Sequence, residues 1–128
     1  MNAILDAHAL LWFFAGSNKL SANALECIQN PTNTLFVSPA TLWEISIKDS
    51  LGKLTLPRPF EKLFPAHLEA SNILILPILV PHLHLQRSLA YHHHDPFDRL
   101  VIAQALAEDL TLVSCDKEFP PYGVSLLW

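Results

Sequence analysis

The chain has 128 residues and a mass of 14.3 kDa, which fits a single domain over residues 1–128. Twelve acidic residues against eight basic ones give a net charge of −4, which excludes a broadly basic surface that coats nucleic acid. No apolar run reaches the roughly 18 residues of a membrane span, and the N-terminus lacks the basic start of a signal peptide. We therefore expect a cytoplasmic protein without a membrane anchor. The 51% hydrophobic content is high and predicts an apolar face for a partner or second copy.

The first half of the chain alternates short apolar runs with helical patterns. The predicted elements are a strand over 3–5, a helix over 7–16, a helix over 21–30, a strand over 34–38 and a helix over 39–52. Ser21 and Ser38 are the predicted N-caps, and Pro39 suits the first helical position. Gly52 predicts the end of the last of these helices.

The second half repeats this alternation. The predicted elements are a short helix over 60–70, a strand over 72–78, a helix over 81–90, a helix over 95–109, and strands over 110–114 and 124–128. Asp95, followed by Pro96, is the predicted cap of the long helix. Because most strands are apolar throughout, the pattern predicts an α/β fold with a parallel sheet flanked by helices on both faces.

Two aspartates, Asp6 and Asp116, come directly after predicted strands. Ligands of open α/β sheets collect at the carboxyl ends of the strands, so both residues are candidates for a functional site. An isolated aspartate at such a place is more often a helix cap or turn former, and that alternative stays open for each.

Three further acids lie in helices. Glu44 is flanked by apolar residues, which favours a buried or functional carboxylate, although an i,i+4 pair with Lys48 explains it as well. Asp95 and Asp98 share one face at the positive end of their helix. Capping explains Asp95 better than Asp98.

If Asp6, Glu44, Asp98 and Asp116 converge, their charges repel and raise the pKa of each carboxyl group unless cations neutralise them. Oxygen ligands without cysteine suit Mg²⁺ or Mn²⁺. The reaction predicted for such a site is metal-assisted hydrolysis of a phosphodiester. The two cysteines, Cys27 and Cys115, form no CxxC pair, and no nucleophile motif or glycine-rich phosphate loop is present.

Four segments together resemble the PIN-domain ribonucleases, specifically the VapC-like toxins of type II toxin-antitoxin systems. They are "ILDAHALLW" at 4–12, "SPATLWEISIK" at 38–48, "HHHDPFDRLVIAQA" at 92–105 and "LVSCDKEFPPYGVSLLW" at 112–128. The resemblance spans nearly the whole chain and implies a PIN-like fold with a five-stranded parallel sheet. It also implies cleavage of RNA with Mg²⁺ or Mn²⁺, a homodimer, and a small VapB-like antitoxin that inserts a segment into the catalytic groove.

The resemblance assigns the four family acids to Asp6, Glu44, Asp98 and Asp116, as catalytic residues and metal ligands. Glu44 would bind the metal directly or through water and orient the attacking water. The accessory candidates are Asp95, Ser114, Arg99 and Lys117, the last two as part of a local basic rim for RNA.

Two positions depart from the family pattern. Ala7 stands where such toxins commonly have threonine or serine, and Cys115 stands where a basic residue is frequent, although Ser114 still offers a hydroxyl group. The alternative function is therefore an attenuated PIN domain that binds RNA or antitoxin without efficient cleavage. A different Mg²⁺-dependent phosphatase or receiver-like domain is disfavoured, because Asp6 lacks a neighbouring acid.

The remaining polar and aromatic residues are assigned to structure. His92, His93 and His94 are consecutive, which is a poor spacing for a metal site on one helix face, and we expect caps or subunit contacts. The alternative is that one of them, His94, touches RNA. His8 is expected to be a buried histidine. The aromatic residues expected in the core are Trp12, Trp43 and Phe97.

Overall fold

A computed structural model describes all residues, 1–128. Its strands are β1 (Asn2–Leu5), β2 (Thr34–Val37), β3 (Ile73–Ile75), β4 (Thr111–Val113) and β5 (Leu126–Leu127). Its helices are α1 (Ala7–Ala15), α2 (Ala22–Gln29), α3 (Pro39–Ser50), α4 (Phe60–Leu63), α5 (Ala66–Ala70), α6 (Val80–Ser88) and α7 (Pro96–Ala107), with a 3-10 turn at Pro120–Tyr122. None of the helices is both long and apolar enough to cross a membrane.

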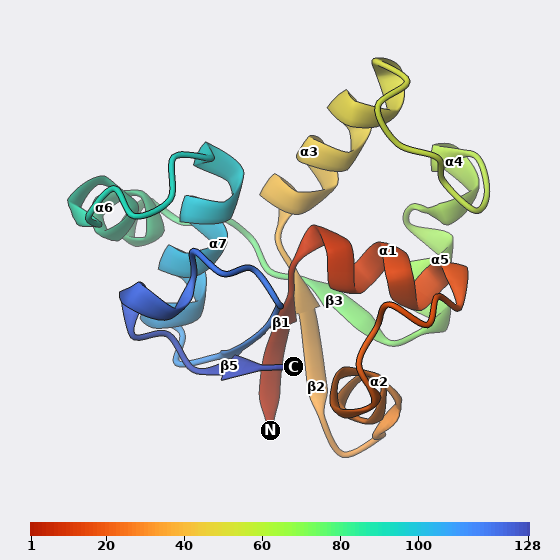
Figure 1. Ribbon diagram of the computed structural model, residues 1–128, viewed down its shortest axis with the longest axis horizontal. Helices are drawn as coiled ribbons and strands as arrows, with labels where there is room; N and C mark the ends of the chain where they lie inside the picture. The colour runs from red at the N-terminus through yellow and green to blue at the C-terminus, as the bar shows by residue number, and fades with distance from the viewer.

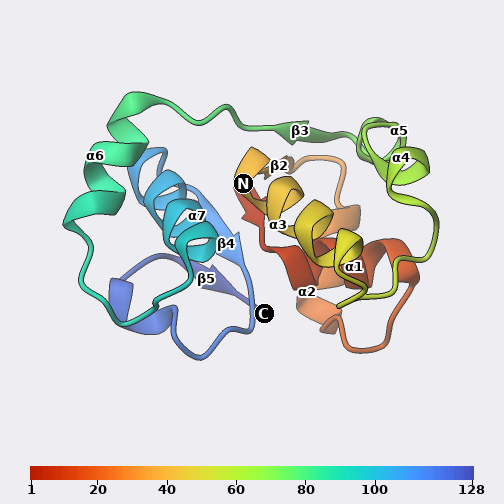
Figure 2. The same ribbon diagram turned by 90° about the horizontal axis from the view of Figure 1, so that it is seen from above.

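The strands form one parallel sheet in the order β3-β2-β1-β4-β5 (Figures 1 and 2). The central strand β1 alternates its side chains between two buried clusters. Ala3 and Leu5 pack with residues of α1 and α2, whereas Ile4 packs with residues of α7. Helices therefore cover both faces of the sheet, and the predicted α/β fold is confirmed.

Side-chain caps fix the start of the helices that face the carboxyl edge of the sheet. Ser38 accepts a hydrogen bond from the backbone N–H of Ala40, and Asp95 accepts from Phe97 and Asp98. These two caps and that of Ser21 were predicted from the sequence. β2 therefore passes directly into α3 at Ser38, whereas Asp95 fixes the start of α7 after the loop that follows α6.

Three details of the prediction are wrong. The single helix expected over 60–70 is two short helices, because Pro65 lacks an N–H and forces Phe64 into an extended conformation. β3 ends at Ile75 rather than at residue 78. Trp43, expected in the core, is 64% exposed on the outer side of α3, where its ring meets the half-buried Phe97 edge-on.

Candidate metal centre

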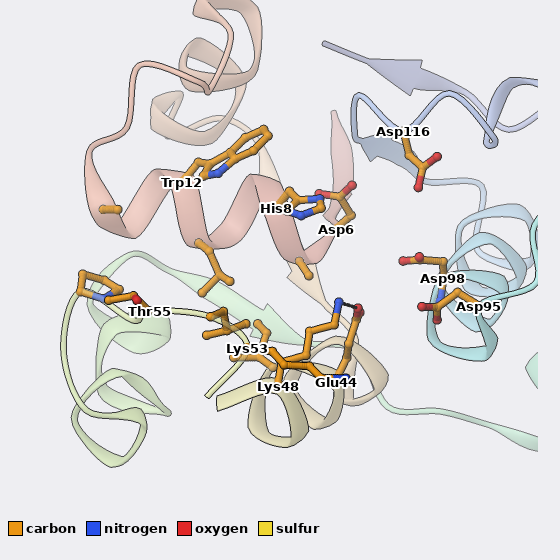
Figure 3. Close-up of a pocket in the computed structure, with 16 residues that line it drawn as sticks. Asp6, His8, Trp12, Glu44, Lys48, Lys53, Thr55, Asp95, Asp98 and Asp116 are labelled. Atoms are coloured by element: carbon orange, nitrogen blue, oxygen red, sulfur yellow. Dashed lines mark hydrogen bonds and ion pairs between the residues drawn. The ribbon is translucent and has the colours of Figure 1, made fainter. Parts of the chain in front are cut away.

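The four predicted acids line one groove of about 520 Å³ at the carboxyl edge of the sheet (Figure 3). Its acidic lining residues are Asp6, Glu44, Asp95, Asp98 and Asp116. Asp6 follows β1, Asp116 comes after β4, and Glu44 and Asp98 reach the same space from α3 and α7. The structure therefore brings together side chains that are up to 110 residues apart in the chain.

Asp6 is both a helix cap and a wall of the groove. Its Oδ1 accepts a 2.8 Å hydrogen bond from the backbone N–H of Ala9, so the capping role that its position suggests is real. Burial is the main cause that raises the pKa of the Asp6 carboxyl group above its ordinary value, and the charge of Asp116 acts in the same direction. Hydrogen bonds from Ser114 and Ala9 oppose the shift.

Glu44 is buried in α3 and holds the ammonium group of Lys48 at 2.6 Å. The i,i+4 pair and the groove position therefore coexist. The hydrogen bond to Glu44 is the largest cause that raises the pKa of Lys48, and the charges of Asp95 and Asp98 add to it. The lysine is thus drawn toward the acidic groove (Figure 3).

Asp95 and Asp98, at the start of α7, have different roles. Asp95 Oδ1 accepts from the backbone N–H groups of Phe97 at 2.8 Å and Asp98 at 3.2 Å, so this carboxylate is used as the cap. Asp98 faces the groove instead. Burial, followed by the charges of Glu44 and Asp95, raises the pKa of Asp98 from 3.8 to about 7.

Asp116 lies in the turn after β4 and is held by its own loop. Its backbone N–H donates to Ser114 Oγ at 3.0 Å, and its Oδ1 accepts from the backbone N–H of Glu118 at 2.8 Å. Ser114, an accessory candidate from the sequence, is buried beside the site and contacts both Asp6 and Asp116.

One residue of the site, His93, was not predicted to contribute to it. Its Nε2 lies 3.2 Å from Asp98 Oδ2 and 3.1 Å from Asp116 Oδ2. The nearest ligand atoms of these three residues all fall within 4.8 Å of one another, a separation that suits a metal site, whereas Asp6 and Glu44 lie outside this close group. The consecutive histidines gave no signal that the middle one turns inward, while His92 and His94 remain exposed.

Arg99 and Lys117 do not form the expected basic rim. The guanidinium of Arg99 is buried and donates to the backbone carbonyl groups of Gln86, Leu89, Ala90 and His93. Lys117 is exposed but does not line the groove. The basic residues of the groove are instead Lys48 and Lys53.

The far end of the groove is aromatic. His8, expected to be buried, is exposed, and its ring stacks on Trp12 with centroids 5.1 Å apart. Both side chains line the groove, so Trp12 is only partly a core residue. The stacked rings of His8 and Trp12, one turn apart on α1, therefore form part of the groove that the acids line.

The two departures from the family pattern differ in their position. Ala7 lines the groove directly after Asp6. Cys115 is an exposed free cysteine, and partial desolvation together with the charge of Asp6 raises the pKa of its thiol, which keeps the group neutral. Unlike a basic side chain, a thiol supplies no positive charge in either protonation state.

Comparison with known structures shows the same fold in several solved chains. A chain of VapBC2 from Rickettsia felis, bound to a promoter DNA fragment, has a TM-score of 0.70 and 19% identity over 98% of this chain and 97% of that one. A chain of FitAcB from Neisseria gonorrhoeae has a TM-score of 0.64 and 18% identity over 98% and 96%. A chain of a Klebsiella pneumoniae toxin-antitoxin complex has a TM-score of 0.64 and 17% identity over 91% and 89%.

No curated protein matches the chain. The family model of the PIN domain matches residues 3–124, a span that contains the five acids of the groove and His93. The resemblance to VapC-like PIN domains noted from the four sequence segments is confirmed by this match and by the fold. The chain belongs to the PIN domain family.

Proposed function

We propose that the protein is a Mg²⁺-dependent endoribonuclease toxin that hydrolyses RNA phosphodiester bonds and is inhibited by a cognate antitoxin. Membership of the PIN family, whose members are generally nucleases, supports a nuclease. The observation that carries the proposal is the convergence of Asp6, Glu44, Asp98 and Asp116 on one groove.

The donor set of the groove fits a hard divalent cation. All four acids offer carboxylate oxygens, and no cysteine lines the groove. Burial, and after it the charges of neighbouring acids, raises the pKa values of Asp6 and Asp98, so a cation bound in the groove would favour their charged forms. Mg²⁺, with Mn²⁺ as a substitute, would supply an activated water and would stabilise charge on the phosphate oxygens.

Each of the residues that line the groove has its own role in the proposed reaction. Asp6, Asp98 and Asp116 would hold the cation, and Glu44 would hold it directly or through water and would orient the attacking water. Lys48 and Lys53 place positive charge on the same groove, where the phosphates of a bound RNA need it. Asp95, as a cap, keeps the first turn of α7 in position.

A small VapB-like antitoxin is the proposed inhibitor. The structures that share the fold come from toxin-antitoxin complexes, which supports such a partner. The aromatic end of the groove, with His8 and Trp12 beside the acids, suits a peptide segment that has both apolar and basic side chains.

The test is to express the wild type and Asp98→Asn in a bacterial host without antitoxin and to map new RNA 5′ ends in total RNA. Discrete new ends in the wild type alone are expected. Asp98→Asn removes a charge but keeps the shape of the side chain, so the variant should fold. A fully active variant would contradict the assignment of the metal centre.

An attenuated PIN domain is the second candidate, favoured by Ala7 at the wall of the groove. In this case the protein binds RNA or antitoxin, and wild type and Asp98→Asn give identical maps of RNA ends. Because a weak site still binds Mg²⁺, detection of cleavage products separates the two candidates better than metal titration does.

A homodimer remains part of the proposal. Trp43 of α3 and Leu83 of α6 are exposed and line an apolar groove, and Leu79 and Val80 are further exposed apolar residues at the start of α6. Light scattering at micromolar concentration should give twice the mass of the chain. A monomer under these conditions would remove the claim.

A further inference from the structure

His93 occupies a buried position between the carboxylates of Asp98 and Asp116. It lies in the segment between α6 and α7, two residues before the cap Asp95. Its Nε2 is 3.2 Å from Asp98 Oδ2 and 3.1 Å from Asp116 Oδ2, so one ring nitrogen meets two acids from different elements. No other side chain links α7 with the loop after β4 in this way.

The other ring nitrogen fixes which tautomer is present. His93 Nδ1 accepts a 3.1 Å hydrogen bond from the backbone N–H of Asp95, whereas the carboxylate of Glu118 lies farther away, at 3.5 Å. A backbone N–H only donates, so Nδ1 must offer its lone pair, and the proton of the neutral ring is on Nε2. The Nε2–H group therefore donates to Asp116 Oδ2, with Asp98 Oδ2 only 3.2 Å from the same nitrogen, and it is not free to coordinate a cation.

The backbone of His93 is anchored as firmly as its ring. Its N–H donates to the hydroxyl oxygen of Tyr122 at 2.8 Å, and its carbonyl accepts from the guanidinium of Arg99 at 3.3 Å. The Tyr122 hydroxyl in turn donates to the carbonyl of Ala90 at 2.6 Å. These hydrogen bonds fix the position of the imidazole in the metal-free protein.

The carboxylates of Asp98 and Asp116 have ligand atoms within 4.8 Å of each other and repel when both are charged. Asp98 belongs to α7, whereas Asp116 belongs to the loop after β4. A shared donor offsets this repulsion and keeps one oxygen of each carboxylate pointing at the same nitrogen. The second oxygen of Asp98 is left for a cation, while Asp116 Oδ1 is also steadied by the backbone N–H of Glu118. Preorganisation of this kind lowers the free energy that cation binding would otherwise spend on ordering the ligands.

We propose that His93 is a positioning residue that holds Asp98 and Asp116 in register for a divalent cation through its Nε2–H group, and that it stays outside the metal's own ligand set. This inference rests on the proposed metal centre. It does not require that RNA be the substrate, because the imidazole acts on the carboxylates.

Two variants of His93 separate its two hydrogen-bonding roles. His93→Gln keeps an N–H donor near the place of Nε2, whereas His93→Asn keeps an acceptor for the N–H of Asp95 but does not reach the carboxylates. His94→Asn, at the exposed neighbouring histidine, is the matched control. Circular dichroism and thermal unfolding confirm that each variant is folded.

The primary readout is the binding of Mn²⁺ to metal-free protein, measured by calorimetry. We expect His93→Asn to weaken the affinity by about tenfold or more, His93→Gln to recover most of this loss, and His94→Asn to bind like the wild type. Equal affinity of His93→Asn and wild type would overturn the proposal.

Nuclear magnetic resonance of the wild-type imidazole provides a second readout that needs no variant. The Nε2 proton should be present in the metal-free protein and should remain after Mg²⁺ is added. If Mg²⁺ displaces this proton, His93 is a ligand and the proposal is wrong. If the wild type cuts no RNA but the Mn²⁺ isotherms and the Nε2 signal behave as expected, the ribonuclease function fails and the role of His93 stands.

Discussion

The two sides of the groove neutralise their carboxylates in different ways. On the α3 side, Glu44 pairs with Lys48, whose side chain is 43% exposed. On the α7 side, Asp98 and Asp116 share the imidazole of His93, whose side chain is only 10% exposed. A half-exposed lysine on a flexible stem moves aside at little cost, whereas the imidazole is held by several buried contacts. The comparison indicates an adjustable α3 side and a preorganised α7 side.

The largest expected effect is on the free energy of unfolding and comes from substituting Arg99, whose buried guanidinium anchors the segment that contains His93. Arg99→Leu leaves the carbonyl groups of Leu89 and His93 without a donor, whereas those of Gln86 and Ala90 keep the N–H of Leu89 and the hydroxyl of Tyr122. One unsatisfied buried carbonyl costs about 1–3 kcal/mol, so the free energy of unfolding should fall by at least about 2 kcal/mol. Urea denaturation measures this loss.

Arg87→Leu is the matched control, because Arg87 is an exposed arginine on α6. Its effect should stay within about 0.5 kcal/mol. Equal midpoints of the two variants would show that the α7 side does not depend on the buried guanidinium, and His93 would then lack one of its proposed anchors.

The buried carboxyl group of Asp98, with other acids beside it, should also make the free energy of unfolding depend on pH. The pKa of Asp98 is about 7 in the folded protein, against an ordinary value of 3.8. Between these values the folded state binds more protons than the unfolded state, so the free energy of unfolding falls as pH rises from about 4 to about 7. The slope is at most about 1.4 kcal/mol per pH unit.

Urea denaturation of metal-free protein at several pH values, with a chelator present, measures this dependence. Asp98→Asn carries no titrating group at this position and should show a flatter profile, with greater stability than the wild type above pH 7. Parallel profiles for both proteins would show that Asp98 is not the group that destabilises the metal-free site.

The sequence predicted the α/β fold and the helix caps, because these depend on local patterns, whereas the convergence of all four acids was implied by the family resemblance. Alternating apolar strands and helices define the sheet, and residues after parallel strands share one edge. Asp6 and Asp116 were therefore placed from position alone. Glu44 and Asp98 were placed by the spacing of their helices and by the family resemblance, and they line the same groove.

What the sequence did not predict depends on tertiary contacts. Three consecutive histidines look equivalent, and only the packing of Tyr122 and Arg99 against the preceding loop turns His93 inward. The same packing uses up the guanidinium of Arg99, which sequence proximity to Asp98 had suggested for the rim. Trp43 looks like a core residue in an apolar segment but lies on the outer side of its helix.

Substitution of Lys48 on the α3 side should change the affinity for Mn²⁺ in the opposite direction from substitution of His93. Lys48→Met removes a cation that competes for Glu44, so affinity for Mn²⁺ should rise. A half-exposed pair contributes about 0.2–1 kcal/mol, which corresponds to a gain of at most about fivefold. Lys53→Met is the control, since Lys53 lines the groove without pairing to Glu44. Weaker binding by Lys48→Met would mean that the lysine orders Glu44 rather than competing for it.

The smallest expected effect concerns Ala7, at the first position of α1 on the wall of the groove. Ala7→Ser adds a hydroxyl group next to Asp6, and stability should change by no more than about 0.5 kcal/mol. One added hydrogen bond of about 0.5–1.5 kcal/mol would raise the rate of RNA cleavage about two- to tenfold, if the hydroxyl steadies Asp6 or a water in the groove. The rate is measured on an RNA that contains the cleavage site mapped in cells. A higher rate of cleavage would show that the missing hydroxyl group at position 7 limits the activity of the wild type. An unchanged rate would show that the four acids and His93 need no hydroxyl group there.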